Sequence, residues 1–504
     1  MIYIDPPYNT GNDFIYNDDF KMSSEEYADE TGELDEEGNR MFKNTDSNGR
    51  FHSDWCSMIY PRLMLARALL KDDGAICISI DGGELTSLKE MCDEVFGASN
   101  YRNTILTRRR IKSLNSQFAD NGLYSLNVGF EYVLVYAKSP EFLMKAIRMK
   151  KENASAKGRW DVFWSNADRP TMRYDILGFT PETGQWRNSE DRAKVAVANY
   201  QKYQQEYEGK VSLEEYAEKT GTTDFIRRIP NGTGKNGGVQ HWVAPSDTML
   251  RTSNWTDIEV SQIGKEIDLP FDNPKSKQLM MEFVKLCDCA ARDLILDFFS
   301  GSATTAHAVM QLNAEDGGHR KFIMVQLPEK CDEASEAFKA GYKNICEIGK
   351  ERIRRAAKKI HEDNPDATFD DGFRVLKLDD TNMKDVYYAA GDYSQDLVSM
   401  LESNVKSDRT DLDLLFGCLL DWGLPLSLPY ISETIDGCMV HTYNDGDLIA
   451  CFDENVPESV IKTIAKRQPL RAVFRDSSFA SSPEKINVGE IFKSLAPDTR
   501  VKVI

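Results

Sequence analysis

The stretch "DLILDFFSGSATTAHAVMQLN", residues 293–313, decides the fold class. An apolar run ends at Asp297, small residues follow as far as Ala303, and a helical pattern starts at Thr304 or Thr305. This order predicts a strand, a tight turn and a helix. Small residues let a ligand approach the backbone at the carboxyl end of a parallel strand, where α/β sheets bind cofactors. The turn lacks the lysine of a P-loop and the GxGxxG spacing, and an ordinary strand-to-helix connection has the same pattern.

Strand and helix patterns alternate on both sides of a long interruption. The expected strands are 1–4, 74–80, 103–109, 129–139 and 321–327, and the expected helices are 54–70, 85–97 and 274–290. Because the pattern stops near residue 139 and resumes near residue 273, we expect one mostly parallel α/β sheet that carries an inserted domain.

Composition places the chain among ordinary globular proteins. With 504 residues, of which 41% are hydrophobic, two to four domains are expected. The sequence shows no secretory leader pattern and no uncharged apolar run that approaches membrane-spanning length, so a cytoplasmic protein that contacts no membrane is expected. The 10 cysteines include no CxxC pair and no histidine spacing suggests ligands, so no metal site is expected.

Charge is distributed unevenly along the chain. The net charge of -19 at first argues against a nucleic-acid partner, because nucleic-acid-binding surfaces place cations against phosphates. Residues 101–270, however, contain 25 lysines and arginines against 21 acids, a net of +4, which leaves -23 for the other 334 residues. We therefore expect a polyanion to bind the middle of the chain, and the acidic stretch 23–39 to be a solvated loop.

A second turn follows an apolar strand in "MIYIDPPYNTG", residues 1–11. Two prolines fix the backbone there, so the carboxylate of Asp5 and the carbonyl of Pro6 are expected to be neighbouring acceptors beside the ring of Tyr8. Such a set suits an amino group on a flat aromatic ring, because the oxygens accept its hydrogens while Tyr8 stacks on the ring. A surface turn with a chance aspartate is the alternative.

The interruption at 139–270 interleaves aromatic residues with arginine, glycine and asparagine, as in "GRWDVFW" (158–164) and "PNGTGKNGG" (230–238). Interleaved aromatic and basic side chains suit contact with a nucleic-acid backbone and stacking on bases. A mixed α+β domain with exposed arginines has the same composition.

Two further segments follow the cofactor half. The helical pattern at 342–363 has a basic face that could meet phosphate, although such a face usually lies in solvent. Residues 373–504 are expected to form a small α/β domain, with strands at 373–378 and 469–477, a helix at 412–423 and a hairpin at 437–452.

Together these motifs resemble those of the adenine-N6 DNA methyltransferases in the permuted order that places DPPY before the cofactor turn. More closely, the chain is similar to the Mod (modification) subunits of type III restriction-modification systems over nearly its whole length. Seven stretches in the expected order carry the resemblance: "IDPPYNTG" (4–11), "HSDWCSMIYPRLMLARALLKDDGAICISIDGGE" (52–84), "EYVLVYAK" (131–138), "RPTMRYDILGFTP" (169–181), "PKSKQLM" (274–280), "DFFSGSATTAHAVMQLNAEDGG" (297–318) and "AVFRDSSF" (472–479).

The resemblance implies a Rossmann-like sheet and a site-specific DNA methyltransferase. Such an enzyme moves a methyl group from S-adenosyl-L-methionine to N6 of an adenine flipped out of double-stranded DNA. The residues implied for catalysis are Asp5, Pro6, Pro7 and Tyr8, and an aspartate at the first of these positions favours adenine over cytosine. The residues implied for the cofactor are Asp297, Phe298, Phe299, Ser300, Gly301, Thr304, Pro274, Lys275 and Gln326. A catalytically silent DNA-binding or assembly subunit and a cytosine-N4 methyltransferase are the alternatives.

The resemblance also implies the division of the chain. Residues 1–138 and 273–340 would be the catalytic and cofactor halves of the methyltransferase domain, 139–272 the target-recognition domain, 341–372 a linking basic helix and 373–504 a C-terminal domain. The C-terminal domain would pair two chains in a homodimer or dock a Res subunit, the ATP-dependent helicase and nuclease of such systems.

Three departures from the family pattern stand out. Ala303 replaces the second glycine of the usual FxGxG turn, which is tolerable if its φ is negative. Gln326 stands where many relatives have an acid that holds the ribose, and it could still donate a hydrogen bond. Family members carry a segment before DPPY, so the chain is expected to be N-terminally truncated, as a gene fragment rather than a split or decayed enzyme.

Overall fold

The computed structural model describes residues 1–10, 14–16, 41–43, 50–109, 126, 128–151, 157–258, 267–271, 274–384, 405–479 and 481–504. The acidic stretch 23–39 lies outside the described residues. The chain forms two compact units, Met1–Asp371 and Gly372–Ile504, each of which is treated by itself. In the part of the chain that the structure describes, no helix combines the length and the apolar character needed to cross a membrane.

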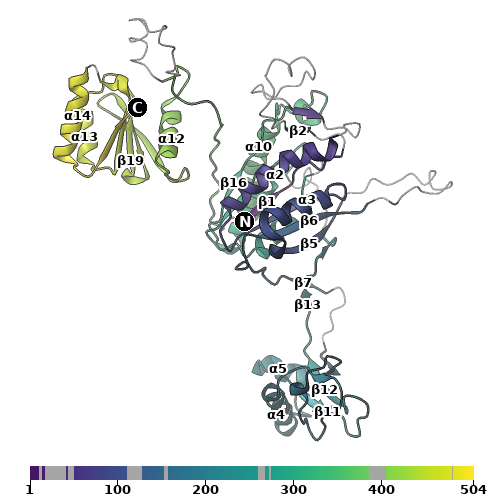
Figure 1. The fold of residues 1–504 in the computed structure, drawn as a ribbon. Helices are drawn as coiled ribbons and strands as arrows, with labels where there is room; N and C mark the ends of the chain where they lie inside the picture. The colour runs from purple at the N-terminus through teal and green to yellow at the C-terminus, as the bar shows by residue number, and fades with distance from the viewer. Residues whose placement is uncertain are drawn as a thin grey trace, which may run out of the picture. The chain divides into compact units, whose positions relative to one another are not determined.

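A seven-stranded sheet, in the order β14-β5-β6-β4-β1-β15-β16, is the centre of the first unit (Figure 1). Its strands are β14 (Asn254–Trp255), β5 (Tyr101–Arg108), β6 (Phe130–Ala137), β4 (Ala75–Ile80), β1 (Ile2–Ile4), β15 (Leu294–Asp297) and β16 (Lys321–Met324). Neighbouring strands run parallel except in the pairs β4–β6 and β5–β6. The predicted, mostly parallel α/β sheet is confirmed. It contains strands from before and from after the inserted segment.

The position of β1 brings the two expected turns together. Ile2 pairs with Ile76 of β4 on one side and with Leu296 of β15 on the other, both in parallel. Because the carboxyl ends of parallel strands meet at one edge of a sheet, the turn after β1 lies beside the turn after β15.

Helices cover both faces of the sheet. Tyr3 faces α7 (Lys277–Leu286) and α8 (Thr304–Asp316), whereas Ile2 and Ile4 face α2 (Phe51–Leu69) and α3 (Leu85–Cys92). This alternation follows from the two-residue period of a strand. A further helix, α10 (Ile345–Asp363), packs on α8. The unit is completed by β2 (Phe14–Tyr16), β3 (Met41–Lys43) and α9 (Glu336–Lys339).

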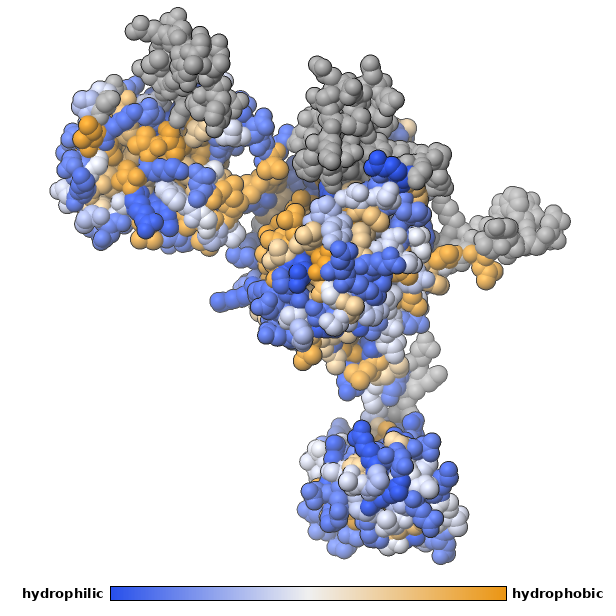
Figure 2. All heavy atoms as spheres, viewed as in Figure 1, coloured by the Kyte–Doolittle hydropathy of each residue, from blue (hydrophilic) through white to orange (hydrophobic). Residues whose placement is uncertain are grey.

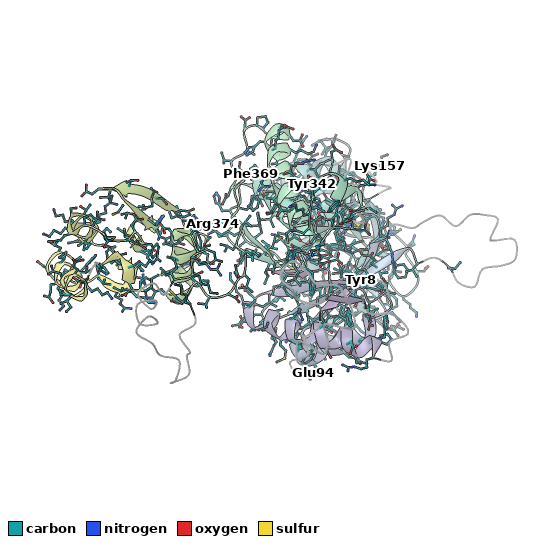
Figure 3. All side chains as sticks on the ribbon, turned by 90° about the horizontal axis from the view of Figure 1, so that it is seen from above. Tyr8, Glu94, Lys157, Tyr342, Phe369 and Arg374 are labelled. Atoms are coloured by element: carbon teal, nitrogen blue, oxygen red, sulfur yellow. The ribbon has the colours of Figure 1, made fainter. Side chains whose placement is uncertain are left out.

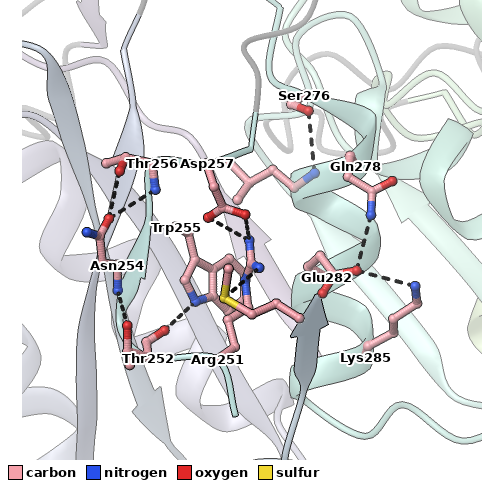
Figure 4. A network of polar contacts seen from close by, with 12 residues as sticks. Arg251, Thr252, Asn254, Trp255, Thr256, Asp257, Ser276, Gln278, Glu282 and Lys285 are labelled. Carbon is pink, nitrogen blue, oxygen red and sulfur yellow. Dashed lines mark hydrogen bonds and ion pairs between the residues drawn. The ribbon is translucent and has the colours of Figure 1, made fainter. Parts of the chain in front are cut away.

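The inserted segment leaves and re-enters the main sheet at a defined point. β7 (Arg148–Lys150) pairs antiparallel with β13 (Thr248–Leu250) at the base of the insertion. Arg251 is 7% exposed and binds both carboxylate oxygens of Asp257 at 3.0 and 2.9 Å (Figure 4). The indole of Trp255 donates to the carbonyl of Thr252 at 2.8 Å. These contacts fix β14, which lies in the main sheet although its residues fall within the stretch 139–272 expected to be a separate domain.

The inserted segment is a small α+β body with its own cores. Its elements are β8 (Arg159–Val162), β9 (Trp164–Ser165), β10 (Gln185–Trp186), α4 (Glu190–Glu206), α5 (Leu213–Thr220), β11 (Ile226–Arg228) and β12 (Val239–Val243). Phe163 and Trp186 pack in one apolar cluster, and Phe225 and Trp242 pack in another. Figure 2 shows a largely hydrophilic surface on this segment. These four aromatic side chains therefore form a core, and the expectation that they stack on bases is wrong for them.

The second unit is built on a five-stranded sheet in the order β17-β18-β19-β20-β21. Its strands are β17 (Tyr430–Ile435), β18 (Cys438–Tyr443), β19 (Leu448–Cys451), β20 (Arg471–Phe474) and β21 (Arg500–Val503), and its helices are α12 (Asp411–Asp421), α13 (Glu458–Lys466) and α14 (Ser482–Leu495). The predicted hairpin at 437–452 is confirmed by the antiparallel pairing of β18 and β19. The predicted strand at 373–378 is wrong, because these residues form no ladder and Leu378 is 93% exposed.

Candidate active site

The DPPY turn, residues 5–8, follows β1 directly. The three residues of β1 are fully buried, and the prolines that follow end the strand because they cannot donate to its ladder. The indole of Trp55, on α2, donates to the carbonyl of Pro7 at 2.7 Å. Asn9 has a φ of 59°, and its side chain donates to Glu84 at 2.6 Å. The carboxyl end of the turn is therefore held by α2 and by Glu84, the residue that precedes α3.

Asp5 and Tyr8 lie together with two residues that come from distant parts of the chain. The hydroxyl of Tyr8, which is labelled in Figure 3, lies 2.8 Å from Oδ1 of Asp5 and 3.1 Å from Oε2 of Glu131 on β6. Nζ of Lys275 donates to Tyr8 and to Glu131, at 2.6 Å each, and lies 3.2 Å from Asp5. Lys275, which was expected at the cofactor, thus has its ammonium group among the residues expected to be catalytic.

The protonation of this cluster follows from burial and from its charges. Burial raises the pKa of Asp5 and Glu131 raises it further, while the ammonium of Lys275 lowers it, and the net result is a raised pKa. Burial alone would lower the pKa of Lys275, but Asp5 and Glu131 outweigh this effect and raise it. Burial and the same carboxylates raise the pKa of Tyr8 well above its ordinary value, so it remains a neutral hydroxyl.

The cofactor turn begins at Asp297, which is 2% exposed. Its carboxylate accepts hydrogen bonds from the hydroxyl of Thr305 at 2.6 Å and from the amide of Phe299 at 3.2 Å. Burial raises the pKa of Asp297 to about 7, although these two hydrogen bonds lower it, and the charge of Asp5 adds a smaller increase. The charges of Asp5 and Asp297, one in each turn, therefore interact.

The backbone of the turn contradicts the expectation for Ala303. Gly301 has a φ of 49° and Ala303 has a φ of 59°, so both lie in the left-handed region. A negative φ at Ala303 was the condition for an unstrained alanine, and the structure does not meet it. The hydrogen bond from the amide of Ala303 to the carbonyl of Ser300, at 2.7 Å, holds this conformation.

An arginine that sequence reasoning missed supports the same turn. Arg352 lies on α10, is fully buried, and donates to the hydroxyls of Ser302 at 2.8 Å and Thr304 at 2.6 Å. A Cβ placed on Gly349, one turn earlier on α10, would lie 3.3 Å from the carbonyl oxygen of Gly301. The helix expected only to link two domains is therefore packed against the cofactor turn.

The basic residues on the remaining faces of α10 have acidic partners. Lys350 lies 2.6 Å from Glu347, and Arg355 lies 2.7 Å from Glu351. The phosphate-binding alternative for this helix therefore has weaker support than the solvent-facing one.

The remaining expected cofactor residues lie around this turn. Oε1 of Gln326, just after β16, accepts a hydrogen bond from the amide of Gly301 at 2.7 Å. Phe298 and Phe299 are partly buried, and their ring centroids are 5.5 Å apart. The amide of Ser300 donates to the carbonyl of Val325 at 3.2 Å, and Pro274 is partly buried next to Lys275.

The turn fits a ligand that approaches the backbone closely. Among the residues that the structure describes, only the tip of the Phe271 ring would come within 4 Å of a Cβ placed on Gly301, at 3.8 Å, so these residues leave room for a ligand above the turn. The carboxyl groups of Asp5 and Glu131, at the ammonium of Lys275, and of Asp297, at the cofactor turn, make an acidic surrounding that suits a cationic group. A sulfonium cofactor would meet both conditions.

One group of possible metal ligands lies outside this site, in the second unit. Cys438, Cys451 and Asp453 offer donor atoms within 4.8 Å of one another. Both thiols belong to the apolar core of that unit, and burial raises the pKa of Cys451 to about 12, so they are protonated side chains of the core.

The fold and the site together define a class. A mostly parallel sheet brings a DPPY turn and a glycine-containing cofactor turn to one edge, which is the arrangement of an α/β methyltransferase. A family model described as DNA methylase, of the N6/N4 type, matches residues 1–358, and the chain belongs to this family.

Several curated relatives are Mod subunits. The chain is 36% identical over 390 residues to the type III restriction-modification enzyme StyLTI Mod subunit of Salmonella typhimurium. This alignment covers 75% of this chain and 56% of that relative. It is 28% identical over 546 residues to the EcoP15I Mod subunit of Escherichia coli, covering 98% of this chain and 80% of the relative. The chain therefore spans just over half the length of the StyLTI subunit.

Two further similarities are to other methyltransferases. The type II methyltransferase M.KpnI of Klebsiella pneumoniae is 29% identical over 374 residues, covering 70% of this chain and 80% of that protein. Among solved structures, the PvuII DNA methyltransferase (cytosine-N4-specific) matches with a TM-score of 0.31 and 12% identity, over 70% of this chain and 85% of that one. No conclusion about this chain is drawn from a TM-score of 0.31.

Proposed function

We propose that the chain is a site-specific DNA methyltransferase that transfers a methyl group from S-adenosyl-L-methionine to N6 of adenine. The observation that carries the proposal is the meeting of Asp5 and Tyr8 with the cofactor turn at Asp297, on adjacent parallel strands. The identity to Mod subunits and the DNA methylase family model support it.

The residues of the chain would act on the target amine as follows. Asp5 and the carbonyl of Pro6 accept the two hydrogens of the exocyclic amine, which turns the nitrogen lone pair towards the methyl group. Tyr8 stacks on the base once it has left the helix. The cofactor supplies an activated methyl on a sulfonium, so the nitrogen forms one bond, the carbon–sulfur bond breaks, and the amine proton leaves to a carboxylate or to water. Asp297, the turn at Ser300 and Gly301, and Gln326 would hold the cofactor.

We further assign two binding roles to the rest of the chain. The inserted segment, within 139–272, would read the target sequence in double-stranded DNA, where exposed basic residues such as Arg159 and Arg169 would contact the phosphates. The unit 372–504 would pair two chains or dock a Res subunit; a partner subunit is supported by the names of the relatives, which describe them as subunits of restriction-modification enzymes.

The test is methyl transfer itself. The full chain is incubated with tritiated S-adenosyl-L-methionine and unmethylated mixed-sequence duplex DNA, and the nucleosides are analysed by mass spectrometry. N6-methyladenine is expected in the wild-type reaction, and Asp5→Ala should abolish it while calorimetry still detects cofactor binding. N4-methylcytosine as the product would overturn the assignment of adenine as the target base. Cofactor binding without any methylated product would overturn the proposal that the chain is a methyltransferase.

A further inference from the structure

Glu131 is the residue of the catalytic cluster to which no role is attached. It lies on β6, its side chain is 16% exposed, and it comes from a strand that pairs with β4 rather than with β1. Oε2 of Glu131 receives the ammonium of Lys275 at 2.6 Å, while Oε1 lies 3.9 Å from Nε of Arg109. Arg109 in turn lies 4.0 Å from Asp81. Glu131 therefore connects the ammonium of Lys275 to a second, partly exposed pair of charges, Arg109 and Asp81.

The ammonium of Lys275 has three hydrogens and three acceptors within reach. Two contacts are short, at 2.6 Å each, to Glu131 and to the hydroxyl of Tyr8. The third, to Oδ1 of Asp5, is 3.2 Å. The contact with Asp5 is therefore the one that breaks most easily.

Oδ1 of Asp5 already has two donors, the hydroxyl of Tyr8 at 2.8 Å and the ammonium of Lys275 at 3.2 Å. A target amine that approaches this oxygen would therefore replace the more distant of the two, the ammonium. With no base in the pocket, removal of Lys275 would leave Asp5 as a partly buried carboxylate beside a second carboxylate, which favours a proton on one of them. A protonated Asp5 would offer a donor to the amine in place of an acceptor.

We propose that Lys275 occupies the amine position on Asp5 while the pocket holds no base, and that Glu131 is the positioning residue that retains its ammonium when the target amine displaces it. This inference rests on the proposed methyl transfer. Lys275 keeps Asp5 ionised and ready to accept hydrogen bonds from the target, and Glu131 holds Lys275 in place.

The charged and titratable groups around Asp5 predict opposite effects for the two partners. Those that act on it or exchange charge effects with it are Tyr3 of β1, Tyr8 of its own turn, Glu131 of β6, Lys275 before α7 and Asp297 of β15. Lys275 lowers the pKa of Asp5, so its loss should raise that pKa. Glu131 raises the pKa of Asp5, so its loss should lower it.

The first test is the pH dependence of single-turnover methyl transfer to unmethylated duplex DNA. In Lys275→Met the acidic limb of the profile should move up by about one pH unit or more, while Lys275→Arg keeps the charge and should retain the wild-type limb. In Glu131→Gln the limb should move down, and KM for DNA should rise about fivefold or more because the displaced ammonium has lost its acceptor. Limbs that stay in place, or that move in the same direction in both variants, would overturn the inference.

The second test does not require activity. Lys275 is acetylated competitively with acetic anhydride in the full chain, and its labelling is read by peptide mass spectrometry against Lys145, an exposed lysine paired with Asp288. Glu131→Gln should increase labelling of Lys275 several-fold and leave Lys145 unchanged. Unchanged labelling of Lys275 overturns the inference even if the wild type proves inactive, whereas inactivity by itself counts only against the proposed function.

Discussion

The indole of Trp55 donates a hydrogen bond to the carbonyl of Pro7 across 2.7 Å, and this bond ties the DPPY turn to α2. Trp55 is fully buried, so no water replaces the donor if it is removed. In Trp55→Phe we expect the free energy of unfolding to fall by about 1–3 kcal/mol, because the partly buried carbonyl of Pro7 loses its donor. We also expect methyl transfer to fall more than cofactor affinity, since the bond positions the catalytic turn.

Trp255→Phe is a matched control for this prediction. It also removes a buried indole donor from a backbone carbonyl, at 2.8 Å, but the carbonyl belongs to Thr252, next to β14. A similar loss of stability with transfer largely retained is expected. Urea unfolding and single-turnover rates measure the two effects, and equal loss of transfer in both variants would contradict the positioning role of Trp55.

Ala303 is expected to be a site where glycine is better than alanine. A residue with a Cβ at a φ of 59° is disfavoured by roughly 1–2 kcal/mol, and the extra freedom of glycine in the unfolded chain offsets about 0.5–1 kcal/mol of the gain. Ala303→Gly should therefore raise the free energy of unfolding by about 0.5–1 kcal/mol.

The same substitution three residues later tests this explanation. Ala306 lies inside α8 and is fully buried, so Ala306→Gly should lower the free energy of unfolding by about 1 kcal/mol. Urea unfolding of both variants decides it. A destabilised Ala303→Gly would show that the turn relaxes to a negative φ.

Gln326 should support the cofactor turn through the amide of Gly301, which lies 2.7 Å from its side-chain oxygen. Gln326→Leu leaves that amide without its acceptor, and affinity for S-adenosyl-L-methionine should fall about tenfold, which corresponds to about 1.4 kcal/mol. Gln326→Glu keeps an acceptor and should bind within a few-fold of wild type.

Calorimetry of the full chain measures these affinities. The matched control is Gln311→Leu, because the side-chain oxygen of Gln311, on α8, accepts a hydrogen bond from Lys277 on α7 rather than from the amide of Gly301. Equal affinity in Gln326→Leu and the wild type would remove Gln326 from the proposed site.

Local pattern was enough to predict the main sheet and the turn at 297–303. The apolar runs of β1, β4 and β15 end at residues that stop a strand, and the helices on both faces have strong apolar spacing. The local sequence pattern did not predict strands correctly where the outcome depends on a neighbouring strand to pair with. The alternating run at 373–378 pairs with no strand in the part of the chain that the structure describes, whereas β14 pairs with β5 although it has only two residues, too few for a period.

The candidate site was predictable only in part for a similar reason. The DPPY turn and Asp297 can be predicted from local sequence, because glycine or proline follows closely after the end of a strand at both places. Glu131, Lys275 and Arg352 reach the site through the fold, from a strand, a loop and a helix far apart in the chain. Arg352 stands four residues from both Ile348 and Ala356, on the apolar face of its helix, and this spacing is the signal that separates it from Lys350 and Arg355.

The buried carboxyl of Asp297 should make the stability of the chain depend on pH. Its pKa is raised to about 7 in the folded state, whereas an unfolded aspartate has a pKa of about 3.9. Between these values the folded state binds more protons than the unfolded state, so this group stabilises the fold fully below about pH 4 and progressively less as the pH rises to about 7. The slope is at most about 1.4 kcal/mol per pH unit. Asp297→Asn, which cannot ionise, should therefore gain stability relative to the wild type from pH 4.5 to 7 and no more above it. Urea unfolding followed by tryptophan fluorescence measures this mainly in the first unit, where all tryptophans except Trp422 lie. Parallel stability curves for variant and wild type would mean that Asp297 is ionised throughout.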